Sequence, residues 1–354
     1  MSKQEKIEQF DPNGIGLTDS GLFGLPFEVE EAEVVVLPVP WDVTTSYRDG
    51  TSNGPEAILW ASRQVDLYYS GIKDAWKMGI AMRAIPMEWS DLNKHYRKKA
   101  NSVIEKLENG VSEDDPEIAE LIQEINEQSS ELNEYVYSRS KAQLEAGKLV
   151  AVLGGDHSTP LGLIRALSEQ HESFGILQID AHADLRDAYE GFEYSHASIM
   201  NNALKNPQVS KLVAVGLRDV CQQEMEAIFN SNDRIVGFFD EQLKARAFAG
   251  ETWSAICDSI ISELPQKVYI SFDIDGLEPS LCPNTGTPVP GGLTFEQAIH
   301  LIKKVVESGR TIVGLDLCEV APSESEWDTN VGARLLYHLC NQMGLSNGRM
   351  PAAD

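Results

Sequence analysis

Three potential metal ligands stand at alternate positions of one short stretch in the middle of the chain. Asp180-Ala181-His182-Ala183-Asp184 directly follows the apolar run 174–179, which predicts a buried strand. Alternate residues of an extended chain point the same way, so the two acids and the imidazole converge if the chain stays extended. Side-chain packing does not require two acids and an imidazole at the end of a strand. The stretch therefore predicts a metal site.

Three further segments place acids or imidazoles directly after predicted strands. Gly154-Gly155-Asp156-His157-Ser158 follows 148–153, Asp273-Ile274-Asp275-Gly276 follows 267–272, and Glu319 follows 311–317. In an open parallel sheet, ligands bind beyond the carboxyl ends of the strands. A histidine in a loop or an Asp-x-Asp cap is ordinary by itself, but four coincidences at one sheet edge are not. The sequence thus predicts one site built from four strand ends.

Carboxylates and imidazoles without a thiolate favour manganese, nickel, cobalt or iron over a structural zinc ion. Four aspartates and two histidines are more ligands than one ion with an open position needs. They suit two ions that share carboxylates at roughly 3.5–4 Å, an arrangement that lowers the pKa of a bound water. The predicted chemistry is hydrolysis by metal-activated water, and the ligands leave open which bond is attacked.

The elements that position these residues alternate regularly along the chain. Strands are predicted at 33–37 (stopped by Pro38), 148–153, 174–179, 211–215, 234–238, 267–272 and 311–317. Helices are predicted at 56–64, 93–108, 116–146, 160–170, 196–204, 222–229, 241–263, 294–307 and 331–343. Short Val/Ile-rich strands separated by helices indicate a parallel sheet covered on both faces. We expect a single-domain, three-layer α/β/α fold with a mainly parallel sheet. Residues 1–32 form an N-terminal extension, 33–354 form the domain, and 85–147 are a polar helical segment within it.

Composition restricts the partners of the chain. The 354 residues carry a net charge of -26, which argues against nucleic acid and anionic membranes and suits a cationic substrate or a metal. The five cysteines form no C-x-x-C pair, which argues against a disulfide framework or a zinc knuckle. The polar N-terminus lacks the apolar core of a signal peptide, and no run approaches the roughly 18 apolar residues of a membrane span. We expect a cytoplasmic protein.

The motifs together resemble those of the ureohydrolase family of arginases and agmatinases. The resemblance rests on Gly-Gly-Asp-His-Ser (154–158), Asp-Ala-His-Ala-Asp (180–184), Ser-Phe-Asp-Ile-Asp-Gly-Leu-Glu-Pro (271–279) and Thr-Gly-Thr-Pro-Val-Pro-Gly-Gly (285–292). It implies an arginase-like single-domain fold, a homo-oligomer (trimer or hexamer) and two divalent ions, manganese first and nickel as the alternative. The implied reaction is attack of a metal-bridging hydroxide on a guanidinium carbon, which releases urea.

The resemblance also implies roles for individual residues. One ion is expected on His157, Asp180, Asp184 and Asp273, and the other on His182, Asp180, Asp273 and Asp275, with Asp180 and Asp273 bridging as catalytic ligands. Glu319 matches the carboxylate that grips the guanidinium, which agrees with the forked donors of that planar cation. His196 resembles the histidine that relays a proton to the leaving amine. Two positions depart from the family pattern. Glu278 is not an expected metal ligand and should have little effect, whereas the segment 281–284 would reshape the rim of the pocket.

Substrate choice depends on loops outside these motifs. The stretch 184–197 is similar to agmatinases and lacks the pattern with which arginases read an α-amino acid. The segments 40–47 and 326–328 are similar to an agmatinase-like branch that includes guanidine hydrolases. In that branch, Trp41 or Trp327 at the mouth would shorten the pocket, and Thr44 or Thr45 would bind a small guanidinium. Alternatively, both tryptophans only pack.

Agmatine, cleaved to putrescine and urea, is slightly favoured on its frequency in the family alone, and free guanidine or a small alkylguanidine is a close alternative. Arginine and guanidinobutyrate follow at a distance. Two other classes remain open. A non-catalytic partner subunit would keep the fold. Missing metal ligands would favour this class, and in this sequence none of the expected ligands is missing. A related deacetylase would need a single zinc ion and a tyrosine donor, and the paired aspartates at 180/184 and 273/275 argue against it.

Overall fold

An eight-stranded sheet runs through the part of the chain that the computed structural model describes, residues 1–17 and 19–350. Residue 18 of the predicted extension and residues 351–354 of the predicted domain lie outside that part. The strand order is β2-β1-β3-β8-β7-β4-β5-β6, and each of these pairings is parallel. The strands are β1 (Val34–Val39), β2 (Ile80–Met82), β3 (Leu149–Gly154), β4 (Phe174–Ile179), β5 (Val209–Leu217), β6 (Ile235–Phe239), β7 (Lys267–Asp273) and β8 (Thr311–Cys318).

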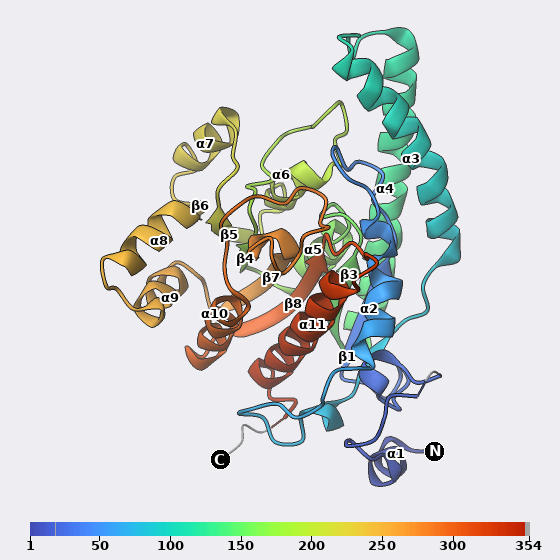
Figure 1. Cartoon of the computed structure of the whole chain (residues 1–354), viewed down its shortest axis with the longest axis vertical. Helices are drawn as coiled ribbons and strands as arrows, with labels where there is room; N and C mark the ends of the chain where they lie inside the picture. Colours follow the sequence, from blue (N-terminus) through green and yellow to red (C-terminus); the bar gives the residue numbers. More distant parts are fainter. Residues whose placement is uncertain (18, 351–354) are drawn as a thin grey trace.

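Both faces of the sheet are buried, as the near-continuous apolar strands predict. In β1, Val34 and Val36 belong to the core cluster on one face, while Val35 and Leu37 belong to the cluster on the other. Helices cover each face and make three layers (Figure 1). The first face packs against α2 (Gly54–Ser62), α8 (Asp240–Phe248), α9 (Trp253–Ser262), α10 (Phe295–Glu307) and α11 (Trp327–Ser346). The second packs against α3 (Met87–Glu108), α4 (Pro116–Glu145), α5 (Leu161–Gln170), α6 (Ile199–Leu204) and α7 (Gln222–Phe229). The three-layer α/β/α prediction is confirmed.

Three details of the predicted elements are wrong. The first strand continues through Pro38 to Val39. The backbone of Pro38 faces β2, and the pairing of β1 with β2 ends at Val36. The missing N–H of Pro38 therefore costs no hydrogen bond between the strands. The short edge strand β2 was not expected, because three residues carry too little periodicity. The single helix predicted at 241–263 is two helices, which separate at Gly250 with its left-handed φ of 94°.

The N-terminal segment packs against the domain. It begins with α1 (Lys3–Gln9), whose first turn is closed by a capping box between Ser2 and Glu5. Farther on, Leu22, Phe23 and Leu25 are buried in the core cluster of the first face. The boundary at residue 33 remains a prediction about domain limits. Among the described helices, each is too short or too polar to cross a lipid bilayer.

Candidate metal centre

The four strand ends that carry the predicted site are neighbours in the middle of the sheet. In the order β3, β8, β7, β4 they present His157, Glu319, Asp273 and Asp180 at one edge. The chain after β3 passes so close to the backbone of Trp41 that only glycine fits at position 155. A Cβ there would lie 2.0 Å from the carbonyl oxygen of Trp41. Gly155 in turn accepts the backbone N–H of Glu319 at 2.8 Å, which joins the ends of β3 and β8. The topology thus brings distant motifs together.

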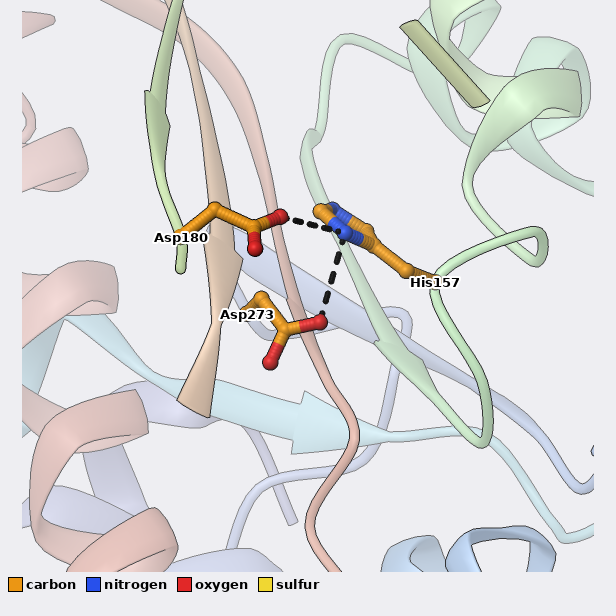
Figure 2. Close-up of side chains that lie close together, drawn as sticks. All are labelled: His157, Asp180 and Asp273. Atoms are coloured by element: carbon orange, nitrogen blue, oxygen red, sulfur yellow. Dashed lines mark ion pairs between the residues drawn. The ribbon is translucent and has the colours of Figure 1, made fainter. Parts of the chain in front are cut away.

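The first group of ligand atoms surrounds the imidazole of His157. Its Nδ1 lies 3.0 Å from Asp180 Oδ2, 3.0 Å from Asp184 Oδ2 and 3.4 Å from Asp273 Oδ2. Figure 2 shows Asp180 and Asp273 pointing from their separate strands at the same nitrogen. His157 is 1% exposed and all three aspartates are buried. One imidazole and three carboxylates therefore converge on one small volume, as the sequence predicted.

A second group shares Asp180 with the first. The Nδ1 atom of His182 lies 3.1 Å from Asp275 Oδ2 and 3.6 Å from Asp180 Oδ1. The two oxygens of Asp180 thus face different histidines, which is the arrangement expected of a bridging carboxylate. Asp273 belongs only to the first of the two close ligand groups, and its Oδ1 accepts the backbone N–H of Asp275 at 2.8 Å. A bridging role for Asp273 remains a prediction.

Two of the site carboxylates stand on left-handed backbone. Asp184 has a φ of 53° and Glu319 a φ of 63°. Such conformations cost free energy in residues other than glycine and concentrate at functional sites. The extended chain assumed from the sequence therefore stops short of Asp184, which reaches His157 through a turn. Alternation alone does not explain its position.

The electrostatics of the site favour the binding of cations. Burial, and then the charge of Asp180, raise the pKa of Asp184 to about 7. Burial, and then Asp275, raise the pKa of Asp273 well above its ordinary value. Burial opposes a charge on His157 too, but Asp180 and Asp184 outweigh it and raise its pKa. Carboxylates crowded together away from water repel one another, and a divalent ion between them relieves that repulsion.

The hydrogen-bond geometry also fits a metal. Although His157 Nδ1 lies close to three carboxylates, it makes no well-formed hydrogen bond to any described residue. The side chains therefore point at a common centre between them. That geometry is typical of metal ligands, and the hard oxygen and imidazole donors suit manganese or nickel. The residues present thus fit two divalent ions.

A cavity of about 240 Å³ opens onto the site. His182 and Asp184 form part of its wall, together with His196, and the segment that follows the Asp-Ala-His-Ala-Asp motif supplies Arg186 and Tyr189. The remaining lining residues are Ser46, Ala197, Asp219, Val220, Cys221, Glu224 and Thr287. The segment 185–196 therefore borders the space in which a substrate meets the ligands.

The predicted substrate-binding residues lie in different environments. Trp41 is fully buried and packs edge-on against Trp89, so the prediction of a mouth position for it is wrong. Trp327 is 44% exposed, and its indole N–H donates to the carbonyl of Ser280 at 2.9 Å. Neither tryptophan lines the cavity in the described chain.

Both predicted threonine hydroxyls have protein partners. Thr45 donates to the carbonyl of Asp42 at 3.0 Å. Thr44 donates to Asp156 Oδ2 at 3.3 Å and accepts the backbone N–H of His196 at 3.2 Å. The geometry thus gives Thr44 a link between the β3 loop and His196, and direct contact of either hydroxyl with a substrate remains a prediction.

Glu319 and His196 flank the ligand groups. Glu319 Oε1 accepts the backbone N–H of His157 at 2.9 Å, while the buried Oε2 makes no hydrogen bond to any described residue. Burial, and then the charge of Asp156, raise the pKa of Glu319 well above its ordinary value. Burial, and then the charge of His182, lower the pKa of His196 to about 3. The site therefore combines a carboxyl group with one free oxygen and a neutral imidazole.

Comparison with known proteins agrees with this geometry. The model of the arginase family matches residues 32–341. The chain belongs to the arginase family. It is 31% identical to the N(1)-aminopropylagmatine ureohydrolase of Synechocystis over 89% of this chain and 90% of that protein. It is 28% identical to the agmatinase of Cronobacter sakazakii over 89% of this chain and 88% of that protein. The solved agmatine ureohydrolase of Thermoplasma volcanium has the same fold, with a TM-score of 0.68 and 24% identity over 96% of this chain and 97% of that one.

The resemblance seen in the sequence is thus confirmed, and the chain is an arginase-family ureohydrolase that acts on amidino C–N bonds. The family depends on a dinuclear metal centre, and this member has two candidate ligand groups joined through Asp180.

Sequence reasoning missed residues of this arginase-family site that lie behind the ligands. Ser271 and Asp316 are fully buried within β7 and β8, where they back the imidazole of His157. A polar residue at a core position of each strand was the available signal. Asp156 was noted only as part of its motif, and its carboxylate binds the hydroxyls of Ser158 and Thr44.

Proposed function

We propose that this chain hydrolyses an alkylguanidine and releases urea, with agmatine as the first candidate. The observation that carries the proposal is the pair of imidazole–carboxylate groups that share Asp180 beside the 240 Å³ cavity. His157, Asp180, Asp184 and Asp273 would hold one ion, and His182 with Asp180, Asp273 and Asp275 the other. When bound, two divalent ions activate water for attack on an electrophilic carbon near neutral pH. We propose manganese for both ions, with nickel as the alternative.

The chain's own residues would orient the substrate and move a proton. Glu319 offers its unpaired Oε2 to the planar, forked donors of a guanidinium, and its charge is best stabilised by that cation. His196 is neutral at pH 7, because its pKa lies near 3. An imidazole with so low a pKa holds a proton only briefly, so His196 would pass the proton that the attacking water gives up directly to the more basic leaving amine. This amine would leave into the cavity that Arg186, Tyr189 and Asp219 help to line.

The residues that line the cavity give no support to a pocket shortened by tryptophan. A shortened pocket was the argument for free guanidine, and it required Trp41 or Trp327 at the mouth. Trp41 lies in the core, and Trp327 is not among the residues that line the cavity. Similar proteins are named for agmatine and N(1)-aminopropylagmatine, which supports an aminoalkyl guanidine. Free guanidine, guanidinobutyrate and arginine follow in that order.

A urea-release screen tests the proposal. The purified chain, loaded with manganese or with nickel, would be offered agmatine, N(1)-aminopropylagmatine, guanidine, guanidinobutyrate and arginine. We expect urea from the first two at higher kcat/KM than from the others. Absence of urea from all five would refute the proposed function. Metal content near two ions per chain would count against a non-catalytic partner subunit. Amide cleavage with zinc would instead indicate a deacetylase.

The family resemblance also supports a homo-oligomer, and we propose a trimer or a hexamer. Light scattering coupled to size-exclusion chromatography measures the mass of the assembly directly. A mass of one chain, 39.1 kDa, would contradict the proposal.

A further inference from the structure

The polar helical segment 85–147 forms a long hairpin of α3 and α4 beside the sheet (Figure 1). Its apolar side packs on the second face of the sheet through residues such as Val103, Ile125 and Leu132. That packing does not explain three polar side chains of the hairpin, Asn93, Arg97 and Asn126. Each is at least partly buried, and each bonds to a loop next to the cavity rather than to the sheet.

The first of these loops is 41–53. Asn93 on α3 donates from Nδ2 to Asp42 Oδ1 at 2.8 Å and accepts the backbone N–H of Asp42 at 2.7 Å. The other carboxylate oxygen of Asp42 accepts the N–H groups of Gly50 at 2.8 Å and Ser52 at 3.0 Å. Asp42 thus closes the loop on itself, and Asn93 fixes the closed loop to α3.

Arg97, one turn farther along α3, holds the same loop at the site. Its Nη1 donates to the carbonyl of Val43 at 2.9 Å and also to the carbonyl of Thr45. The residue between these carbonyls is Thr44, whose hydroxyl accepts the backbone N–H of His196. A continuous series of contacts therefore runs from the Arg97 guanidinium through the loop to the predicted proton-relay histidine.

The second loop is 189–196, and α4 holds it. Asn126 donates from Nδ2 to the carbonyl of Gly191 at 3.0 Å and accepts the backbone N–H of Glu193 at 2.9 Å. The contact is close, because a Cβ on Gly191 would lie 2.5 Å from Ile122 Cδ1. These two anchored residues lie between Tyr189 and His196, which both line the cavity.

We propose that the α3–α4 hairpin positions both walls of the substrate cavity, with Arg97 and Asn126 as the positioning residues. Arg97 fixes the wall that carries Ser46 and, through Thr44, His196. Asn126 fixes the loop 189–196, in which Tyr189 pairs with Phe192 and lines the cavity. The kinetic part of this inference rests on the proposed function, whereas the structural part rests on the contacts alone.

Asn126→Ala tests the second wall, and Gln123→Ala is its matched control. Gln123 lies one turn earlier on α4 and is exposed, and within the described chain its amide bonds only to Glu127 of the same helix. In the metal-loaded enzyme, we expect Asn126→Ala to speed amide hydrogen exchange within 189–196. Loss of two hydrogen bonds should raise KM by about tenfold, with less change in kcat and an unchanged metal content. Gln123→Ala should leave exchange, KM and metal content as in the parent chain.

Arg97→Ala tests the first wall, and Arg97→Lys tests rescue. Because Arg97 acts on His196 through Thr44, we expect its removal to lower kcat more than it raises KM. A lysine keeps the charge but lacks the rigid, planar group in which Nη1 of Arg97 donates to both carbonyls, so it should restore activity only in part. If Asn126→Ala fails to fold, Asn126→Asp replaces it, because the carboxylate still accepts the N–H of Glu193 but cannot donate to Gly191.

The outcomes separate this inference from the proposed function. If Asn126→Ala matches Gln123→Ala in both exchange and KM, the hairpin only packs and the inference is wrong. If Arg97→Ala shows the kcat and KM of the parent chain, the first wall is not held by α3. If the parent chain releases no urea while exchange in 189–196 still rises in Asn126→Ala, the proposed function fails and the structural inference stands.

Discussion

The hydroxyl of Ser271 lies 2.9 Å from Nε2 of His157, on the opposite side of the imidazole from the site carboxylates. Ser271 also donates to Asp316 Oδ2 at 2.9 Å. Because that bond uses the only hydroxyl hydrogen, Ser271 accepts from Nε2–H of His157. In the neutral imidazole, Nδ1 then carries the lone pair that faces Asp180. The chain Asp316–Ser271–His157 thus selects the tautomer that can ligate a metal.

Ser271→Ala should therefore weaken metal binding without removing a ligand. Loss of an outer hydrogen-bond partner of a ligating histidine lowers metal affinity by about 10- to 100-fold. Titration of the metal-free protein with manganese, followed by urea release at each concentration, measures the shift. Ser173→Ala is the control, because among the described residues the hydroxyl of this exposed serine bonds only to Ser210. Unchanged metal affinity in Ser271→Ala would show that the tautomer does not depend on Ser271.

Asp180→Asn should remove both ions together, because Asp180 is shared by the two ligand groups. An amide offers one neutral oxygen in place of two charged ones, so neither group retains its full charge. We expect metal analysis to find well below one ion per chain and urea release to fall to background. Asp258→Asn is the control, since Asp258 is exposed, pairs with Lys304 and is not among the residues that line the cavity. Retention of two ions in Asp180→Asn would contradict the shared role.

Metal binding should release protons at neutral pH. Burial lowers the pKa of His182, but Asp275 and then Asp180 outweigh it and raise the pKa to about 12. At pH 7, which lies below this pKa, the metal-free imidazole is protonated, whereas a ligating imidazole is neutral. Affinity should therefore rise with pH across the neutral range. Calorimetric titrations with manganese, in buffers of different ionisation enthalpy, measure the released protons. An apparent enthalpy independent of the buffer would contradict this expectation.

The sequence predicts the ligands better than the surroundings that hold them. His157, Asp180 and Asp273 could be found because each lies at or just beyond the end of an apolar strand, and parallel strands place such ends at one edge. The position of Asp184 could not be predicted in this way, because it depends on a left-handed turn of the backbone. Arg97 and Asn126 carry no local signal either. They look like ordinary solvated helix residues, and their partners lie more than fifty residues away along the chain.

Glu319→Gln should separate substrate binding from metal binding. The amide oxygen of glutamine can still accept the backbone N–H of His157, as Glu319 Oε1 does, so the local fold and the metal content should remain. The negative charge that would face a guanidinium is lost. Since hydrogen bonds to charged groups contribute about 1.5–3 kcal/mol each, kcat/KM for agmatine should fall by about 100-fold or more. Steady-state urea release together with metal analysis checks both parts. A variant that keeps its kcat/KM would show that another residue binds the guanidinium, and one that loses its metal would place Glu319 among the residues that support the ligands.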